Sequence, residues 1–394
     1  MMRPKVVITG FGVVSALGMG AERHVVALRN GQSGVGEVRF LQTEHREFPV
    51  GEVPCGSEEL RQLLDLPVGR RYSRTSLLGI TALREALTQA HLLDRQGLAL
   101  ISGTTVGGMD VTERFFPESV PDLDHDLHDC GASTNDIADA FGCFDYTSTV
   151  STACSSAMNA LIMGKLLIES GERDIVLAGG AEALSRFHLN GFKSLMILDT
   201  QPCRPFDKTR AGLNLGEGAA FLVLESEASA KARGVGILGV LSGAGNACDA
   251  YHQTATSETG DGAYLAMKQA LGDAGLQSED IGYVNAHGTG TPNNDATEST
   301  ALRRLFGAVL PPVSSTKSYT GHTTSASGSI EAAFCLIALR NGFLPVQPEF
   351  ENPDEQCVTP VAGSKALDAG LRHVMCNAFG FGGNDSSIIL SRYE

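Results

Sequence analysis

The sequence predicts a large α/β fold made of two similar halves. Short apolar runs that are typical of buried strands alternate with stretches of helical periodicity along all 394 residues. We expect strands at residues 6–9, 98–102, 175–178 and 220–224, and helices at residues 75–90, 155–170 and 264–274. Alternation of this kind is typical of layered α/β proteins whose strands are mostly parallel.

A weak internal repeat supports the two halves. An expected strand in the first half leads into Ser102-Gly-Thr-Thr105, and one in the second half leads into His287-Gly-Thr289. Each half then has a helix rich in small residues, opened by Cys154 in the first and by His322 in the second. The charged segment 225–233 would join the halves, so we place the domains at residues 1–234 and 235–394.

Composition excludes several function classes. The net charge of −15 disfavours nucleic-acid binding, which needs a basic surface. Nine cysteines without paired spacing predict reduced thiols and a cytoplasmic location. No run of about 18 apolar residues occurs, so we expect no membrane span.

Cys154 is the first candidate for chemistry. It lies in the segment Val-Ser-Thr-Ala-Cys154-Ser-Ser-Ala, where an expected strand turns into a helix. A helix N-terminus favours a thiolate, and its free backbone N–H groups can face a developing oxyanion. A buried structural cysteine is the ordinary alternative, and we keep that interpretation for the other eight cysteines.

Three further motifs, each in an expected polar or glycine-rich loop, contain candidate functional groups. His287 follows an expected strand at residues 283–286, where α/β proteins present side chains to a cleft, although a purely structural loop histidine fits equally well. Lys317 and His322 lie five residues apart before an expected helix that contains Glu331, and a buried lysine needs such a partner. The glycine-rich turn within residues 376–384 can place a backbone N–H at a catalytic centre.

In this order, the four motifs resemble those of β-ketoacyl-[acyl carrier protein] synthases of the elongating Cys-His-His type. The segment 204–218 is also similar to that family, and the likeness runs from residue 7 to residue 389. It implies a thiolase-like fold in which two similar halves stack as five αβαβα layers around the active site. The implied activity is that of an acyltransferase: decarboxylative Claisen condensation of an acyl chain on Cys154 with malonyl-[acyl carrier protein], in fatty-acid or polyketide and polyene chain elongation.

The resemblance also implies residue roles. Cys154 resembles the nucleophile, and His287 and His322 resemble the pair that bind the malonyl thioester carbonyl and promote decarboxylation. Lys317 resembles the family's invariant lysine with Glu331 as its partner, and the backbone N–H groups of Cys154 and Phe381 resemble the oxyanion hole. The resemblance implies substrate contacts as well. Thr289 and Thr291 would hold the pantetheine arm and Val106 would line the acyl pocket. Phe379, Gly380 and Gly382 would belong to the mobile turn beside that pocket.

Acyl carrier protein is the implied partner, since its phosphopantetheine arm would carry the substrates, and no metal or other cofactor is expected. The acid-and-histidine run 122–129 is interpreted as a solvated loop, because it lacks a fixed ligand spacing. An acidic carrier needs a local basic patch for docking, and Arg70, Arg71 and Arg74 form the densest basic cluster, although a solvated helix start explains them equally well. A homodimer is the expected assembly, with a heterodimer with a ketosynthase-like paralogue as the alternative.

Neighbouring enzyme classes differ at identifiable positions. Initiating synthases and plant-type polyketide synthases use Cys-His-Asn, whereas the third member here is His322. Biosynthetic thiolases carry a cysteine in the last glycine-rich turn, which here reads Ala378-Phe379-Gly380. An acyl-thioester hydrolase and an accessory subunit of a ketosynthase pair are further alternatives, although Cys154 argues against the latter. The stretches 189–196 and 212–216 resemble synthases of specialised pathways, such as those for bacterial aryl-polyene or flexirubin pigments.

Overall fold

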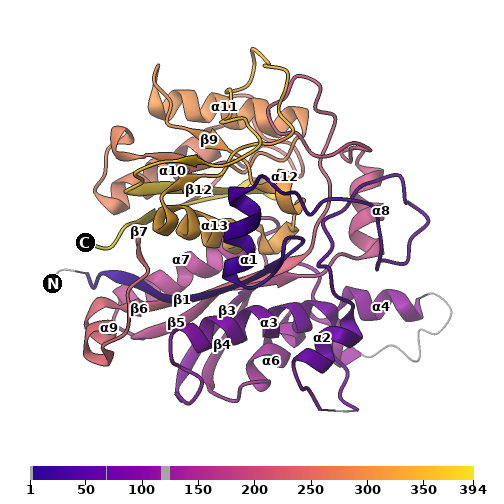
Figure 1. The fold of residues 1–394 in the computed structure, drawn as a ribbon, viewed down its shortest axis with the longest axis vertical. Coiled ribbons are helices and arrows are strands. Elements are labelled where there is room, and N and C mark those ends of the chain that lie inside the picture. The colour runs from indigo at the N-terminus through magenta and orange to yellow at the C-terminus, as the bar shows by residue number, and fades with distance from the viewer. Residues whose placement is uncertain (1–2, 68, 117–124) are drawn as a thin grey trace.

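The computed structural model describes residues 3–67, 69–116 and 125–394 as a layered α/β fold (Figure 1). The first half of the chain has the strands β1 (Val6–Ser15), β2 (Gly18–Met19), β3 (Leu98–Gly103), β4 (Phe144–Val150), β5 (Ile175–Glu182) and β6 (Gly218–Ser226). Its helices are α1 (Ala21–Arg29), α2 (Ser57–Leu63), α3 (Arg74–Gln89), α4 (Met109–Phe115), α5 (His125–His128), α6 (Cys130–Asp139), α7 (Ser156–Glu169), α8 (Arg186–Ser194) and α9 (Glu227–Arg233).

The second half repeats this pattern with fewer helices. Its strands are β7 (Gly239–Cys248), β8 (Tyr283–Asn285), β9 (Val313–Ser314), β10 (Phe343–Leu344), β11 (Leu367–Asp368), β12 (His373–Gly380) and β13 (Asn384–Ser391). Its helices are α10 (Asp261–Ala274), α11 (Pro292–Phe306), α12 (Lys317–Thr320) and α13 (Ser327–Asn341), and three short 3₁₀ turns lie at Ser278–Asp280, Thr324–Ala326 and Phe381–Gly383.

The two halves have the same strand order. The main sheet runs β4-β3-β5-β6-β1-β7-β13-β12-β8-β9, and β1 pairs with β7 where the halves meet. Each half contributes five strands to this order. Counted along the chain within each half and read outward from the junction, they appear as the first, fifth, fourth, second and third. The predicted repeat is therefore confirmed as a structural one, while the boundary at residues 234/235, just after α9, stays a proposal.

The expectation of mostly parallel strands was wrong. β3 runs parallel to β4 and β5, and β8 runs parallel to β9 and β12, but every other pairing in the main sheet is antiparallel. One antiparallel pairing could have been predicted from the sequence. Only the short turn Phe381–Gly383 separates β12 from β13, and a connection that short can join only antiparallel strands.

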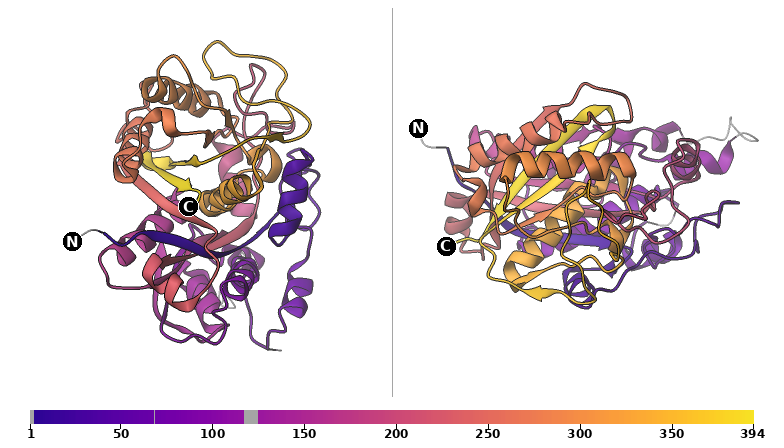
Figure 2. Two further views of the ribbon diagram at one scale, coloured as in Figure 1. Left: turned by 60° about the vertical axis from the view of Figure 1, so that its left-hand side comes forward. Right: turned by 90° about the horizontal axis from the view of Figure 1, so that it is seen from above.

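Helices and sheets form five layers (Figure 2). α3 packs on the outer face of the first half-sheet, α10 packs on the outer face of the second, and α7 and α13 lie between the two half-sheets in contact with each other. The expected αβαβα arrangement is thus present. All seven expected elements are found. β1 is longer than expected, since it continues past Gly12 to Ser15. A Cβ at Gly12 would lie 2.0 Å from the Ala82 carbonyl oxygen, so glycine is what permits the close packing of this strand against α3.

The central layer determines the character of the active site. Every residue of α13 from Ser327 to Leu339 is buried, because this helix has a sheet on each side rather than one face in water. α7 and α13 both begin at the same end of this layer, so the residues before them, Cys154 and His322, meet in the buried interior. Within the described residues, no helix is long and apolar enough to cross a membrane.

Candidate active site

Cys154 lies on a sharp turn between β4 and α7. Ala153 adopts a left-handed backbone conformation with φ of 50°, which reverses the chain just before the cysteine. The Cys154 side chain is 6% exposed, and its Sγ lies 3.1 Å from Nε2 of His322. The predicted strand-to-helix position of the thiol is therefore confirmed, and a base lies within reach of its proton.

The protonation state of Cys154 differs from the expectation. Burial raises the pKa of the Cys154 thiol to about 11, and this outweighs the opposing effects of the Lys317 charge and of the backbone N–H groups of Phe381 and of Cys154 itself. The helix N-terminus alone therefore does not produce a thiolate at neutral pH, so the resting group is a thiol that needs a proton acceptor.

His322 is held by both its backbone and its ring. Its backbone N–H donates to the Asn214 carbonyl over 2.7 Å, and its carbonyl accepts from Gly216 over 2.9 Å. Its Nδ1 lies 2.9 Å from Oγ of Ser327, the first residue of α13. These contacts give the family-like segment 204–218 a function: it fixes the loop that carries the second histidine.

His287 follows β8, as predicted, and its ring is held by Lys317. The Nζ of Lys317 lies 3.3 Å from Nδ1 of His287. Because an ammonium group only donates hydrogen bonds, Nδ1 must accept and the ring proton resides on Nε2. Both backbone N–H groups of His287 and Gly288 donate to the carboxylate of Glu298 on α11, over 2.9 and 2.7 Å.

Lys317 forms the predicted buried ion pair with Glu331. Nζ of Lys317 lies 2.5 Å from Oε1 of Glu331, and the side chains are 1% and 3% exposed. Burial raises the pKa of Glu331 to about 7, while the Lys317 charge opposes that rise. The pair places one positive charge, compensated by a carboxylate, beside His287.

Both histidines are neutral at physiological pH. Burial lowers the pKa of His287 well below its usual value, with further lowering by Lys317 and His322. Burial and the Lys317 charge do the same to His322, together with the neighbouring His188. The two rings lie nearly perpendicular with centroids 5.3 Å apart. Two neutral imidazoles can therefore donate or accept hydrogen bonds at one small volume in front of Cys154.

The glycine-rich turn lies beside the thiol. Backbone N–H groups of Phe381 and Cys154 face the sulfur, which is why both lower its pKa. A Cβ at Gly380 would lie 3.0 Å from the Thr152 carbonyl oxygen and 3.3 Å from the Cys154 nitrogen, so glycine allows this close contact. The Phe381 ring stacks on Phe192 of α8 with centroids 5.8 Å apart.

A cavity of about 340 Å³ opens onto these groups. Its lining includes all the predicted substrate contacts except one, together with four of the six catalytic candidates: Cys154, His287, Thr289, Thr291, His322, Phe379, Gly380, Phe381 and Gly382. The other two candidates, Lys317 and Glu331, do not line it. Oγ1 of Thr289 and Oγ1 of Thr291 lie 2.9 Å apart. Val106 is half-buried after β3 and does not line this cavity, so its predicted contact with the acyl chain stays a prediction.

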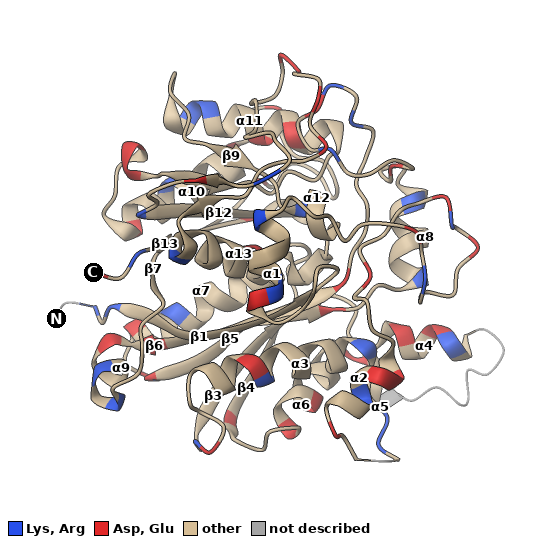
Figure 3. Ribbon diagram, viewed as in Figure 1, with Lys and Arg blue, Asp and Glu red and all other residues tan. Residues whose placement is uncertain are grey.

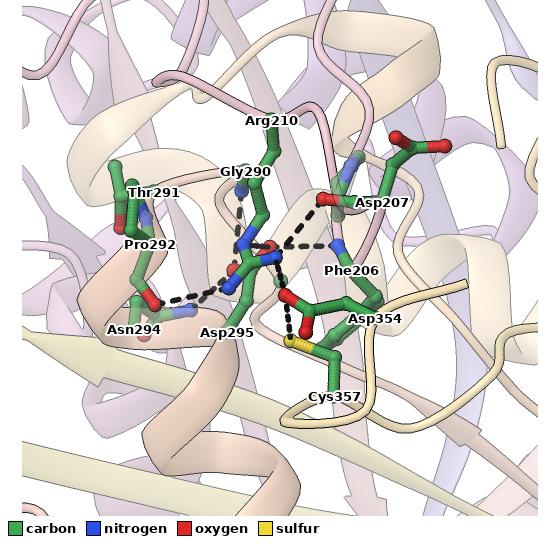
Figure 4. A network of polar contacts seen from close by, with 12 residues as sticks. Phe206, Asp207, Arg210, Gly290, Thr291, Pro292, Asn294, Asp295, Asp354 and Cys357 are labelled. Atoms are coloured by element: carbon green, nitrogen blue, oxygen red, sulfur yellow. Dashed lines mark hydrogen bonds and ion pairs between the residues drawn. The ribbon is translucent and has the colours of Figure 1, made fainter. Parts of the chain in front are cut away.

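Arg210 holds the threonine loop in place (Figure 4). Its guanidinium donates to Asp354 over 2.5 Å and to the Pro292 carbonyl over 3.3 Å, and it pairs with Asp295 at 3.6 Å. Asp295 in turn accepts the backbone N–H of Gly290. This buried network links the segment after Arg204 to the loop that carries Thr289 and Thr291, which sequence reasoning did not anticipate.

The predicted basic patch is smaller than expected. Arg74 is buried at the start of α3, where its guanidinium donates to both carboxylate oxygens of Glu217, over 2.8 and 2.5 Å, so its assignment to a docking surface was wrong. Arg70 is partly exposed but pairs with Asp136 and Asp139. Arg71 is exposed and has no ion pair among the described residues. Along the ribbon in Figure 3, basic residues are interspersed with acidic ones around α2 and α4.

Metal binding finds no support in the described part of the chain, which contains no cluster of three or more His, Cys, Asp or Glu side chains arranged for an ion. Residues 122–124 of the acid-and-histidine run 122–129 lie outside the described residues. All nine cysteines are described, and none forms a disulfide.

Sequence reasoning missed the carboxylates that hold the histidine loop. Asp295 and Glu298 lie three residues apart near the start of α11, and both are completely buried. Their spacing on one helix face was a usable signal, since each follows the motif that carries His287. The burial of these two carboxylates could not be predicted from the sequence, because an acidic pair at the start of a helix is usually exposed to solvent.

The fold and site define a condensing enzyme of the thiolase-like class. The family models for the N-terminal and C-terminal domains of β-ketoacyl synthase match residues 3–230 and 238–351. The chain is 32% identical to 3-oxoacyl-[acyl-carrier-protein] synthase 2 of Staphylococcus aureus (strain COL) over 417 residues, covering 99% of each chain. It is 34% identical to nodulation protein E of Rhizobium meliloti (strain 1021), covering 98% of each chain. The chain belongs to the β-ketoacyl synthase family.

Solved structures agree with this assignment. The ishigamide ketosynthase/chain length factor matches with a TM-score of 0.94 and 34% identity over the whole of both chains. The ketosynthase ApeO of Xenorhabdus doucetiae, in complex with its chain length factor ApeC, gives a match with a TM-score of 0.84 and 31% identity over 99% of this chain and 98% of that one. The reaction is the decarboxylative condensation of an acyl chain with malonyl-[acyl carrier protein], an acyltransferase activity of fatty-acid and polyketide synthesis.

Alkylation of Cys154 by iodoacetamide should become faster as the pH rises through the alkaline range. The thiol is protonated below a pKa of about 11, so the reactive thiolate fraction grows with pH. Peptide mass spectrometry separates Cys154 from the exposed Cys248, which serves as the internal control. A rate that is already at its plateau near neutral pH would show a preformed thiolate and contradict the structure.

Proposed function

We propose that Cys154, His322, His287 and the Lys317–Glu331 pair carry out the condensation in three steps. One observation carries the proposal: a buried thiol lies 3.1 Å from a neutral imidazole, and a second neutral imidazole, held by a buried cation, lies beside the first. This arrangement supplies one nucleophile, one proton acceptor and two hydrogen-bond donors in a single cavity.

In the first step the acyl chain moves from its carrier to Cys154. The thiol proton passes to Nε2 of His322 as sulfur attacks the acyl thioester. The negative charge on the thioester oxygen faces the backbone N–H groups of Cys154 and Phe381, and one such donor is typically worth about 3 kcal/mol of barrier. The carrier thiol leaves and takes the proton back from His322.

In the second step the malonyl thioester loses carbon dioxide. The bond to the carboxylate carbon breaks, and its electron pair becomes an enolate whose oxygen accepts hydrogen bonds from the two histidines. His287 always presents N–H at Nε2, since Lys317 occupies Nδ1. His322 can present N–H at Nε2 as well, because the hydroxyl of Ser327 can either donate to Nδ1 or accept from it.

In the third step the enolate carbon attacks the acyl-Cys154 carbonyl. The new carbon–carbon bond forms, the carbon–sulfur bond breaks, and the thiolate takes a proton from solvent. The product is β-ketoacyl-[acyl carrier protein]. A neutral pair of histidines suits this sequence, since a protonated His322 could not accept the thiol proton in the first step.

The carrier arm would reach the thiol through the cavity that Thr289 and Thr291 line. A solved acyl carrier protein–ketosynthase complex, AntDE:AntF, is described as bound to the hexaketide and is 26% identical to this chain, with a TM-score of 0.85. We propose that acyl carrier protein is the partner here, that the chemistry needs no further cofactor, and that the protein is cytoplasmic.

The working unit is proposed to be a dimer. β4 is a seven-residue strand that pairs with β3 on one side and forms the edge of the described sheet on the other. An exposed edge strand is a natural place for a second chain to pair. The likeness to the ishigamide ketosynthase/chain length factor and to ApeO with its chain length factor supports a ketosynthase-like paralogue as the alternative second subunit, and a specialised pathway as the setting.

Substitutions should separate the steps. Cys154→Ala should form no acyl-enzyme but still release carbon dioxide from malonyl carrier. His287→Ala should stop decarboxylation and leave acyl transfer near normal, whereas His322→Ala should stop decarboxylation and also slow acyl transfer by about 100-fold, because it removes the base. Intact mass and carbon dioxide release report the two steps, with the exposed His91→Asn as control. Equal loss of acyl transfer in both histidine variants would reject this division of roles.

Arg71→Glu should raise the KM for acyl-carrier substrates by about fivefold, the size of an exposed charge interaction, and leave the reaction with a small acyl thioester unchanged. Arg71 is chosen because reversing Arg70 would also break its pairs with Asp136 and Asp139. Arg95→Glu, an exposed arginine beyond the other end of α3, is the matched control. An unchanged carrier KM would remove Arg71 from the docking surface.

In solution the purified chain should have twice the mass of one subunit by light scattering. A stable and active monomer would contradict the dimer. An inactive chain that gains activity only when it is co-expressed with a ketosynthase-like paralogue would replace the homodimer with the heterodimer.

A further inference from the structure

Asn384 lies where the glycine-rich turn re-enters the sheet. It is the first residue of β13 and follows the turn Phe381–Gly383. Its side-chain Oδ1 accepts three hydrogen bonds: from Oγ of Ser155 over 2.7 Å, from Nδ2 of Asn159 over 2.7 Å and from Nδ2 of Asn246 over 3.1 Å. One oxygen therefore joins three segments that are far apart in the sequence.

Two of those donors belong to the turn that presents the nucleophile. Ser155 directly follows Cys154, and Asn159 lies one helical turn further along α7. Both also reach back to Thr152: Asn159 donates to Thr152 Oγ1 over 2.9 Å, and Ser155 Oγ lies 2.7 Å from the Thr152 carbonyl oxygen, so the single hydroxyl proton of Ser155 is shared between that carbonyl and Asn384 Oδ1. Because an amide nitrogen has two protons, Asn159 can bond Thr152 and Asn384 at once.

The third donor anchors the cluster to the neighbouring strand. Nδ2 of Asn246 on β7 lies within hydrogen-bond distance of Asn384 Oδ1, of Asn159 Oδ1 at 3.0 Å and of Ser386 Oγ at 2.9 Å, and its two protons are shared among these three oxygens. Ser386 in turn donates to Oδ1 of Asn159 over 2.8 Å. The cluster thus ties α7 of the first half to β7 and β13 of the second half.

This link matters because the two proposed oxyanion donors come from different halves of the molecule. The Cys154 N–H belongs to the start of α7, and the Phe381 N–H belongs to the turn between β12 and β13. Both must point at one oxygen atom, and a shift of about 1 Å in a reacting group can cost about 100-fold in rate. Asn384 is three residues from Phe381, and its partner Ser155 is one residue from Cys154.

We propose that Asn384 is a positioning residue, which fixes the distance between the Cys154 and Phe381 backbone N–H groups by clamping the glycine-rich turn to the start of α7. The inference rests on the proposed function, in which these N–H groups hold the thioester oxygen. Asn384 touches no reacting atom, so it acts only through the two segments that it joins.

The test compares Asn384→Ala with Asn384→Asp. Alanine removes the acceptor, whereas aspartate keeps it, and Nδ2 of Asn384 donates no hydrogen bond to the described residues. Acyl transfer to Cys154, followed by intact mass in a single turnover, should fall about 10- to 100-fold in Asn384→Ala and largely recover in Asn384→Asp. Carbon dioxide release from malonyl carrier, which uses the two histidines, should stay near the wild-type rate in both.

Other outcomes would overturn the proposal. An unchanged acyl-transfer rate in Asn384→Ala would show that the clamp is not needed, and equal losses of both steps together with a lower melting temperature would show a general structural role. Asn341→Ala, an exposed asparagine at the far end of α13, is the control. Failure of the proposed function itself would appear separately, as absence of acyl label on Cys154 in the wild-type protein.

Discussion

The burial of one positive charge between two sheets is the constraint on which the active site depends. Lys317 lies in the central layer, where an unpaired charge is strongly disfavoured, and Glu331 on the fully buried helix α13 compensates it. Removing one member of such a pair typically costs about 3–5 kcal/mol, so the site and the core are stabilised together. The same charge orients His287 and helps to keep both histidines neutral.

The two histidines are equally buried, but their ring nitrogens have different hydrogen-bonding roles because their neighbours differ. His287 faces a cation that only donates, so its ring has one usable tautomer. His322 faces the hydroxyl of Ser327, which donates or accepts, so its ring can accept a proton from Cys154 at Nε2 in one tautomer and present N–H at Nε2 to an enolate in the other. In the proposed reaction a fixed donor therefore lies beside an adaptable base, because His322 exchanges a proton in the acyl-transfer step whereas both rings donate to the enolate.

Local patterns predicted the elements and the chemical groups but not their surroundings. Strand and helix positions follow from apolar periodicity, and the Cys154, His287 and His322 motifs each lie at the end of an element, as expected. Strand direction was misjudged because periodicity carries no information on the neighbouring strand. The basic cluster was misjudged for a related reason, since nothing local distinguishes Arg71 on the surface from Arg74, whose partner Glu217 lies 143 residues away.

The sequence by itself determined the family, the two-half α/β plan and the candidates for the nucleophile, the histidine pair and the buried Lys317–Glu331 pair, because each of these depends on short motifs and their order. Only the tertiary structure decided the charge states and the positions of the acting groups. The pKa of Cys154 depends on how completely the surrounding layers bury the thiol, and the proposed oxyanion donors come from chain segments more than 200 residues apart that contact each other through Asn384. Desolvation and long-range contacts are properties of the assembled layers, which no local stretch of sequence contains.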